Sequence, residues 1–274
     1  MLMNTASLEA RACPACEGEQ ADTRHVVGAW RVVACRDCSF VYLPVAAKTE
    51  YFTQGEGAWE TSIKAARTLK LQTSPVVARL SLATRFRTKF RKRTPVEYIE
   101  ASLDAPRDSA LKVLDIGCGS GSYLSSLDER FIPYGVELSE GLAAQAQTAF
   151  SARGGHVVNA ATIDALPQFL PGSIDAVVMR SYLEHEPRAR EVLAGVHAVL
   201  CTGGIAVVKV PNYASWNRRI MREGWCGFRF PEHVNYFTPD SLHKMAASVG
   251  LSCEQSVLDR LPTSDNMWAV LRKA

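Results

Sequence analysis

A short apolar stretch followed by three glycines at alternate positions constrains this chain most strongly. Residues 111–116 read as a buried strand, and Gly117, Gly119 and Gly121 follow before a helical pattern that begins near Tyr123. Glycine tolerates the positive φ angles of such a turn and lets a ligand approach the backbone closely. The free N–H groups at the start of the next helix then attract an anionic or carboxylate group. The sequence therefore predicts a strand, a ligand-binding loop and a helix, in that order.

Strands and helices alternate after this loop. The strand-like runs are 131–137, 156–159, 174–179 and 205–210, and the helical runs are 139–152 and 188–200. This alternation predicts an α/β fold, with a mostly parallel sheet that carries helices on both faces. Ligands of such sheets bind outside the carboxyl ends of the strands. The tail differs, because a helix at 239–249 precedes strand-like runs at 251–258 and 267–271, which predict an antiparallel hairpin on the sheet edge.

Four of the eight cysteines form two C-x-x-C pairs near the N-terminus. Cys13 and Cys16 make the first pair, and Cys35 and Cys38 make the second after eighteen intervening residues. Four thiolates on two tight turns can enclose Zn²⁺ in a closed tetrahedral shell, which is a structural site. A redox pair is the alternative. We expect residues 1–45 to form a small zinc-ribbon-like module in a reducing cytoplasm, in preference to a disulfide scaffold.

Charge is distributed unevenly along the chain. The net charge of +3 is too small to indicate a nucleic-acid partner, but residues 61–96 hold ten Lys or Arg and no acidic residue. They belong to a segment, 46–104, that reads as a helical lid or linker before the main domain at 105–274. The basic face is either simply solvated or a binding surface for an anionic or nucleotide-linked substrate, or for RNA. No signal peptide is recognisable, and no apolar run approaches the ~20 residues of a membrane span, so we expect a cytoplasmic protein.

Residues 115–121 (DIGCGSG) resemble the first motif of class I S-adenosylmethionine-dependent methyltransferases. Ser122 stands where the dinucleotide fingerprint requires glycine or alanine. The resemblance continues through an acid that ends the second strand, a fourth-strand signature at 172–178, an L-E-H loop at 181–187 and a G-G turn at 200–204. It implies a Rossmann-like doubly wound sheet and S-adenosylmethionine as the cofactor.

The same resemblance implies which residues contact the cofactor. Glu137 would accept hydrogen bonds from both ribose hydroxyls, and Asp164 would lie beside the adenine. The complete predicted set is Asp115, Gly117, Cys118, Gly119, Gly121, Tyr123, Glu137, Leu138, Asp164 and Arg180.

Residues 212–237 are expected to form an insert on the acceptor side. The ribbon and residues 225–239 together resemble bacterial methyltransferases of secondary-metabolite and polysaccharide pathways, although Glu232 replaces the arginine of the usual Pro-Arg-His. The candidate catalytic residues are His233, His185 and Tyr236. Histidine suits a general base near neutral pH, and structural hydrogen bonding in a loop is the alternative for both histidines. Four aromatic residues on the acceptor side either line an acceptor pocket or pack in a core. They are Tyr182, Trp225, Tyr236 and Phe237.

Some relatives bind a divalent metal through a carboxylate three residues before the E-H pair, and Ser181 occupies that position here. The resemblance therefore argues against a catalytic metal, and the metal that we expect is the structural zinc of the four cysteines. We expect methyl transfer to oxygen or nitrogen of a small natural-product or sugar-like acceptor. The alternatives are an RNA methyltransferase, a zinc-ribbon scaffold without turnover, and non-methyl alkyl transfer or cyclisation with the same cofactor. The oligomeric state is not readable from the sequence.

Overall fold

The computed structural model describes residues 8–48, 94–106 and 108–274, and its largest element is a seven-stranded sheet. The strand order is β12-β13-β10-β9-β6-β7-β8. The five strands from β10 to β8 run parallel, whereas β13 pairs antiparallel with both β10 and β12. The strands are β6 (Leu111–Ile116), β7 (Phe131–Val136), β8 (Val157–Val158), β9 (Ile174–Arg180), β10 (Leu200–Pro211), β12 (Leu251–Glu254) and β13 (Asn266–Lys273). The predicted α/β class and the C-terminal hairpin on the sheet edge are confirmed.

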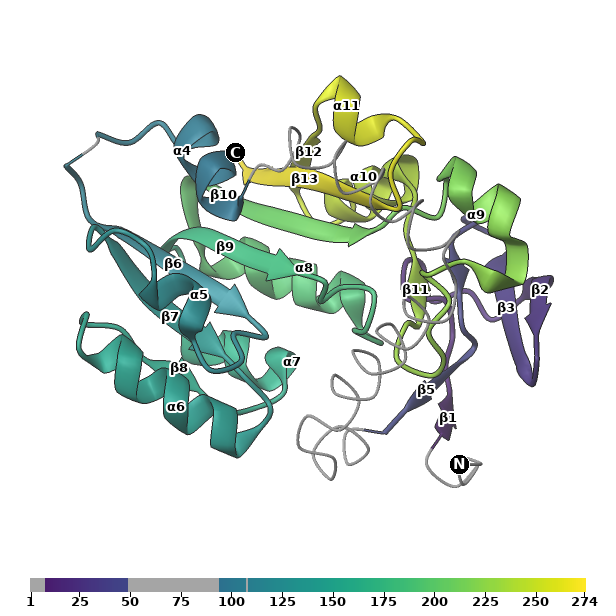
Figure 1. The fold of residues 1–274 in the computed structure, drawn as a ribbon, viewed down its shortest axis with the longest axis horizontal. Helices are drawn as coiled ribbons and strands as arrows, with labels where there is room; N and C mark the ends of the chain where they lie inside the picture. Colours follow the sequence, from purple (N-terminus) through teal and green to yellow (C-terminus); the bar gives the residue numbers. More distant parts are fainter. Residues whose placement is uncertain (1–7, 49–93, 107) are drawn as a thin grey trace, which may run out of the picture.

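Helices cover both faces of this sheet (Figure 1). They are α4 (Pro95–Ser102), α5 (Ser122–Ser125), α6 (Glu140–Ser151), α7 (Thr162–Ala165), η2 (Leu166–Gln168), α8 (Ala189–Val199) and α10 (Pro239–Ala247). Successive side chains of a strand point to opposite faces. In β9, Val177 and Met179 therefore join the core beneath α8 and α10, and Ala176 and Val178 join the core beneath α4 and α6.

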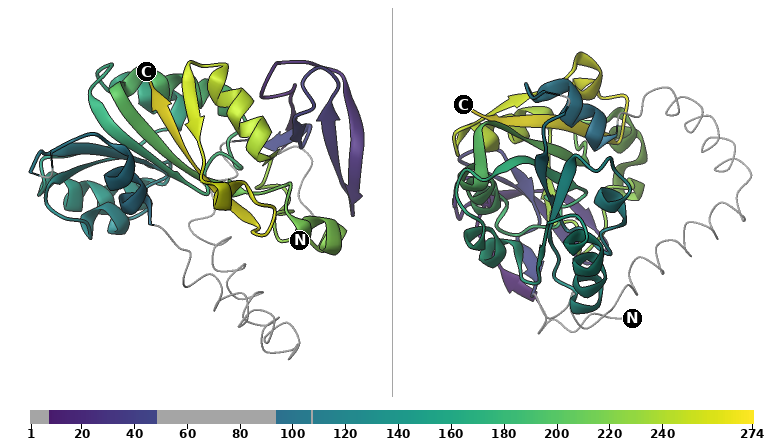
Figure 2. Two further views of the ribbon diagram at one scale, coloured as in Figure 1. Left: turned by 90° about the horizontal axis from the view of Figure 1, so that it is seen from above. Right: turned by 90° about the vertical axis from the view of Figure 1, so that its left-hand side faces the viewer.

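A second, four-stranded sheet joins the N-terminal module to the main domain. It has the order β11-β4-β3-β2, with β2 (Ala21–Val27), β3 (Trp30–Cys35), β4 (Val41–Tyr42) and β11 (Asn235–Tyr236). The strand β11 comes from the acceptor-side insert, so Asn235 pairs with Tyr42 although almost the whole main domain separates them in sequence. Figure 2 shows the N-terminal strands beside one end of the large sheet. In Figure 1 the arrowheads of β6, β9 and β10 point toward this side.

Two predicted elements differ from the structure. The segment expected to be helical from residue 46 begins inside β5 (Val45–Ala47), which pairs with β1 (Leu8–Ala10) and buries Ala46 and Ala47. The strand-like run 251–258 ends at Glu254, because Ser256 accepts a hydrogen bond from the Asp259 N–H and begins α11 (Val257–Arg260). At residues 45–47, pairing with the distant strand β1 overrides the helical pattern, and at Ser256 a local helix cap ends the strand-like pattern.

Residues 49–93, which include most of the basic stretch 61–96, lie outside the described residues. The helical form predicted for them stays a prediction. The insert adds α9 (Trp216–Met221) and η3 (Arg222–Gly224). Within the described parts of the chain, no helix combines the length and apolar character needed to cross a bilayer.

Candidate active site and metal centres

The glycine loop leaves the carboxyl end of β6 in a left-handed conformation. Gly117, Gly119 and Gly121 have φ angles of 73°, 56° and 75°. A Cβ on Gly121 would lie 2.8 Å from the Phe150 ring and 3.0 Å from Cα of Ala146, so this glycine allows α6 to pack against the loop. A Cβ on Gly119 would meet nothing within 4 Å. Gly119 therefore borders open space that a ligand can use, a distinction that the spacing of the glycines does not reveal.

Glu137 lies across the rim of this loop. Its Oε2 accepts a hydrogen bond from the Gly119 N–H at 2.8 Å, and its Oε1 accepts one from the Ser139 N–H at 2.9 Å. The Asn159 side chain donates to the carbonyls of Glu137 and Leu138 at 2.8 and 3.1 Å, which fixes the backbone that carries the carboxylate. The sequence analysis missed Asn159, because an asparagine after a short strand has no distinctive pattern.

Behind the loop, Asp115 is only 3% exposed. Burial raises the pKa of its carboxyl group to about 7, the positive charge of Arg180 opposes this shift, and Glu137 adds to it. The Arg180 guanidinium stacks 4.0 Å from the centre of the Tyr123 ring. Cys118 is also buried, and burial raises the pKa of its thiol to about 12, so the thiol is neutral. These predicted cofactor residues are brought together at one end of β6.

Asp164 and Leu138 are less closely tied to the loop. Asp164 is exposed on α7, and the half-buried Leu138 follows Glu137. By contrast, Tyr182 lies against the loop, since a Cβ on Gly117 would be 3.4 Å from its ring. The Tyr182 hydroxyl donates to Glu186 at 2.5 Å. Tyr182 thus connects the glycine loop with the L-E-H loop that follows β9.

The L-E-H loop and the insert bring both predicted histidines together. The rings of His185 and His233 have centroids 4.7 Å apart and are nearly perpendicular. Nδ1 of His185 lies 3.0 Å from the Glu232 carbonyl oxygen, and Nδ1 of His233 lies 2.8 Å from that of Gly227. Glu184 completes the group, with one ligand atom of each of the three side chains within 4.8 Å of the others. The sequence analysis did not select Glu184, although it adjoins His185.

Burial dominates the electrostatics of this group. It raises the pKa of Glu184 to about 8, against the effect of the positive charges of Lys209 and Arg229. It lowers the pKa of His185 to about 4 and that of His233 well below the ordinary histidine value. The Oε2 atom of Glu184 has no hydrogen-bond partner among the described residues. Near neutral pH both imidazoles are therefore uncharged.

The aromatic residues of the insert pack rather than face an open site. Trp225, Tyr236 and Phe237 are each at most 2% exposed. The Trp225 indole donates to Asp265 at 2.8 Å, and the Tyr236 hydroxyl donates to the His233 carbonyl at 2.9 Å. Tyr236 thus supports the loop of His233, and its predicted catalytic role remains a prediction.

Asn235 of the insert connects the ribbon and the L-E-H loop through side-chain hydrogen bonds. Its side-chain oxygen accepts from Arg11 at 2.7 Å, and its side-chain nitrogen donates to the carbonyls of Leu183 and Glu186 at 2.7 Å each. The Val234 and Asn235 N–H groups both donate to the Glu184 carbonyl. No sequence signal marked Asn235, because its three partners come from two distant segments.

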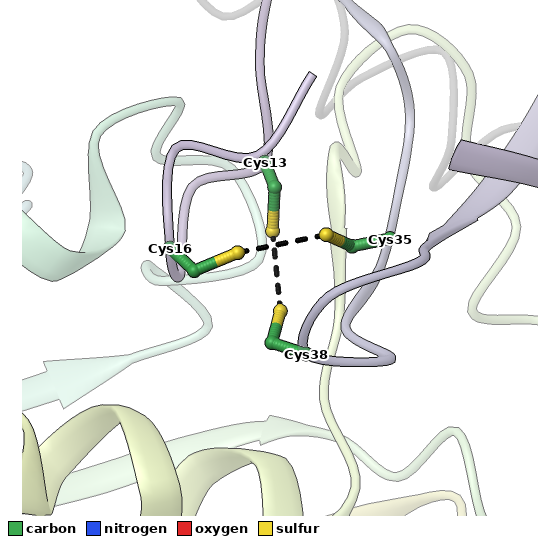
Figure 3. A group of neighbouring side chains, drawn as sticks. All are labelled: Cys13, Cys16, Cys35 and Cys38. Carbon is green, nitrogen blue, oxygen red and sulfur yellow. Dashed lines mark hydrogen bonds between the residues drawn. The ribbon is translucent and has the colours of Figure 1, made fainter. Parts of the chain in front are cut away.

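The four N-terminal cysteines form the predicted metal-binding group (Figure 3). Sγ of Cys13 lies 3.5 Å from that of Cys38, and Sγ of Cys16 lies 3.5 Å from that of Cys35. A tetrahedral Zn²⁺ with bonds of about 2.3 Å requires sulfur atoms about 3.8 Å apart. The two knuckles share one turn geometry: the residues after the second cysteines, Glu17 and Ser39, have φ angles of 63° and 62° and donate N–H to the carbonyls of Cys13 and Cys35. The arrangement fits structural zinc.

Comparisons with known proteins agree with this geometry. Residues 84–256, more than half of the chain, match a family described as a methyltransferase domain. None of the curated proteins matches the chain.

Solved structures also resemble the chain. An S-adenosylmethionine-dependent methyltransferase from Archaeoglobus fulgidus is 20% identical, with a TM-score of 0.49 over 70% of this chain and 99% of that one. One from Mesorhizobium loti is 16% identical, with a TM-score of 0.49 over 64% and 96%. The [4+2]-cyclase SpnF is 17% identical, with a TM-score of 0.46 over 65% and 79%.

Proposed function

Because the chain belongs to the family of S-adenosylmethionine-dependent methyltransferase domains, we propose that it methylates an oxygen or nitrogen atom of a small-molecule acceptor. One observation carries the choice of acceptor class. The ribbon strand β4 pairs with β11 of the insert and thereby holds the insert at the carboxyl ends of the main strands. The polar groups beside this joint, Glu184 and His233, are at most 4% exposed. The described part of this side thus presents buried polar groups and not the open basic surface that an extended polyanion requires, which favours a small acceptor.

The described residues fit the cofactor. Gly119 borders open space, and Glu137 keeps lone pairs on both carboxylate oxygens that two ribose hydroxyls can reach. We assign the methionine end of the cofactor to Asp115 and the glycine loop, the ribose to Glu137 and Leu138, and the adenine to Asp164. When bound, S-adenosylmethionine supplies a methyl group on a positively charged sulfur. The chain itself contributes mainly orientation, which lowers such barriers by several kcal/mol.

In this proposal, residues on the acceptor side remove the proton from the acceptor. An acceptor hydroxyl must lose its proton as its oxygen bonds to carbon, whereas an amine attacks with a free lone pair. His185 and His233 are the candidate groups, since both imidazoles are neutral near pH 7. The backbone N–H of His185 donates to the carbonyl of Tyr182, whose ring lies against the glycine loop at Gly117. Tyr236 would contribute by holding the His233 loop.

The test has a binding step and a turnover step. We expect calorimetry to detect S-adenosylmethionine and S-adenosylhomocysteine at micromolar Kd, and Glu137→Ala to weaken both by about tenfold or more, since charge-assisted hydrogen bonds are lost. Release of S-adenosylhomocysteine would then be followed with low-molecular-weight metabolite fractions and, separately, with total RNA. Turnover with a metabolite fraction supports the proposal. Turnover with RNA alone, falling steeply with salt, would overturn the acceptor class.

A further inference from the structure

We propose that Glu184, His185 and His233 bind a divalent transition-metal ion at the acceptor side, separately from the four-cysteine site. The binding site stands on its own geometry, and its role in methyl transfer rests on the proposed function. The resemblance to relatives predicts no metal here, because Ser181 replaces their carboxylate ligand. The fold supplies a different third ligand, since the insert places His233 beside the Glu184-His185 pair.

The ligand atoms of the three side chains are spaced almost as in a metal coordination shell. One ligand atom from each of the three side chains lies within 4.8 Å of the others. A tetrahedral ion with bonds of about 2.0–2.1 Å requires separations of about 3.3 Å, so the ligand atoms would have to move closer together by at most about 1.5 Å. Two imidazoles and one carboxylate are a common donor set for divalent zinc, manganese or iron with open positions.

The histidines are preset for metal binding. Because a carbonyl oxygen only accepts hydrogen bonds, Nδ1 of His185 facing Glu232 O and Nδ1 of His233 facing Gly227 O must both carry the ring proton. The lone pair of each ring therefore lies on Nε2. Hydrogen bonds from the other ring nitrogen to backbone carbonyls are the usual means by which proteins fix the tautomer and orientation of metal-binding histidines.

Glu184 provides the second, independent observation. Its side chain is 1% exposed, and its Oε2 atom has no hydrogen-bond partner among the described residues. A buried carboxyl oxygen without a partner is costly, by about 1–3 kcal/mol. The charged side chains that affect Glu184 are Lys209 and Arg229, and neither bonds to Oε2. A divalent ion would satisfy this atom.

The site explains how an acceptor hydroxyl could be activated. Three protein ligands leave at least one coordination position open for the acceptor oxygen, and a bound cation lowers the pKa of a hydroxyl that it coordinates. The hydroxyl releases its proton to solvent, the oxygen forms a bond to the methyl carbon, and the carbon–sulfur bond breaks with its electron pair remaining on sulfur.

The experiment measures how many metal ions the full chain binds. Protein stripped with a chelator would be titrated with Co²⁺, which reports the ligand type by absorption, and metal content would be measured by mass spectrometry. We expect two equivalents: one with thiolate-to-cobalt charge-transfer bands at the cysteines, and one with weak d–d bands only. Glu184→Gln and His233→Gln should each remove the second equivalent and keep the first. His243→Gln, at an exposed histidine of α10, is the matched control.

The outcomes separate this proposal from the proposed function. A wild-type chain that takes up only the thiolate-bound cobalt, and no second Mn²⁺ or Zn²⁺ at saturating metal, would overturn the metal site. So would a second equivalent that survives both variants. Calorimetric S-adenosylmethionine binding and circular dichroism verify folding of the variants, and wild-type stoichiometry decides the question even if a variant does not fold. Methyl transfer by a chain without the second metal would leave the proposed function intact.

Discussion

The cofactor side and the acceptor side of this protein are built in opposite ways. The glycine loop and Glu137 follow consecutive parallel strands, β6 and β7, and the Gly119 N–H donates to Glu137 across only 18 residues of sequence. The acceptor side joins the N-terminal ribbon, the loop after β9 and the insert, and Asn235 alone bonds to two of these distant segments. The first side depends on local backbone geometry, and the second depends on contacts across the whole chain.

The difference has an energetic consequence. The glycine loop is anchored to the core of the large sheet, where Leu114 and Ile116 are at most 1% exposed. The insert is held by β11, which has only two residues and pairs with β4 of the zinc ribbon. A small module built around the four-cysteine cluster therefore holds the insert, so we expect that each side can be damaged without the other.

The largest expected effect comes from removing a zinc ligand. We expect Cys16→Ser to lose bound zinc and to reduce turnover by at least about 100-fold, because zinc supplies much of the folding free energy of such modules and β11 loses its partner β4. The Kd for S-adenosylmethionine should change by less than about threefold. Metal analysis, calorimetry and a methyl-transfer assay measure these quantities.

Cys253→Ser, at a half-buried cysteine in β12 far from the cluster, is the control and should leave zinc and turnover unchanged. If zinc loss weakened cofactor binding as strongly as turnover, the two sides would not be separable and the comparison would fail.

A second prediction reverses the test by damaging the cofactor side alone. Gly119 and Gly28 have similar φ angles, 56° and 59°, and a Cβ on either meets nothing within 4 Å. Alanine at either position should cost about 1–2 kcal/mol of backbone strain. Only Gly119→Ala also fills ligand space, so we expect it to weaken S-adenosylmethionine binding by about 30-fold, with no such change for Gly28→Ala.

Thermal unfolding verifies that both glycine variants lose similar stability, and calorimetry compares their Kd values. Equal cofactor affinity in the two variants would show that Gly119 does not border the ligand.

The smallest predicted effect is a pH dependence confined to the cofactor side. The Asp115 carboxyl group has a raised pKa of about 7, so it is ionised above pH 7 and protonated below it. The ionised form attracts the ammonium group of S-adenosylmethionine. Affinity should therefore fall by up to about tenfold as the pH decreases from 7.5 to 6, within the range where the ligand's own amino group stays protonated.

Calorimetry across this pH range measures the effect, and Asp115→Asn should give weaker binding that does not vary with pH. A wild-type Kd that stays constant between pH 6 and 7.5 would contradict the assignment of Asp115 to the methionine end.

The sequence by itself determined the features that depend on residues close together in the chain. Alternating strand and helix patterns predicted the doubly wound sheet, the spacing of glycines predicted the loop, and two C-x-x-C knuckles predicted the four-cysteine cluster, because each depends on residues within a few turns of chain. The pattern failed at Val257 and Leu258, where a capping serine begins a helix although the residues are apolar.

Only the tertiary structure decided how the acceptor side is assembled. Pairing of β4 with β11, the contacts of Asn235 and the meeting of Glu184 with His233 join segments that no sequence periodicity links. The burial that sets the protonation of these groups also exists only in the folded chain, because it arises from packing between remote elements. The glycine loop can therefore be predicted from the sequence, whereas the meeting of Glu184, His185 and His233 is a product of the fold.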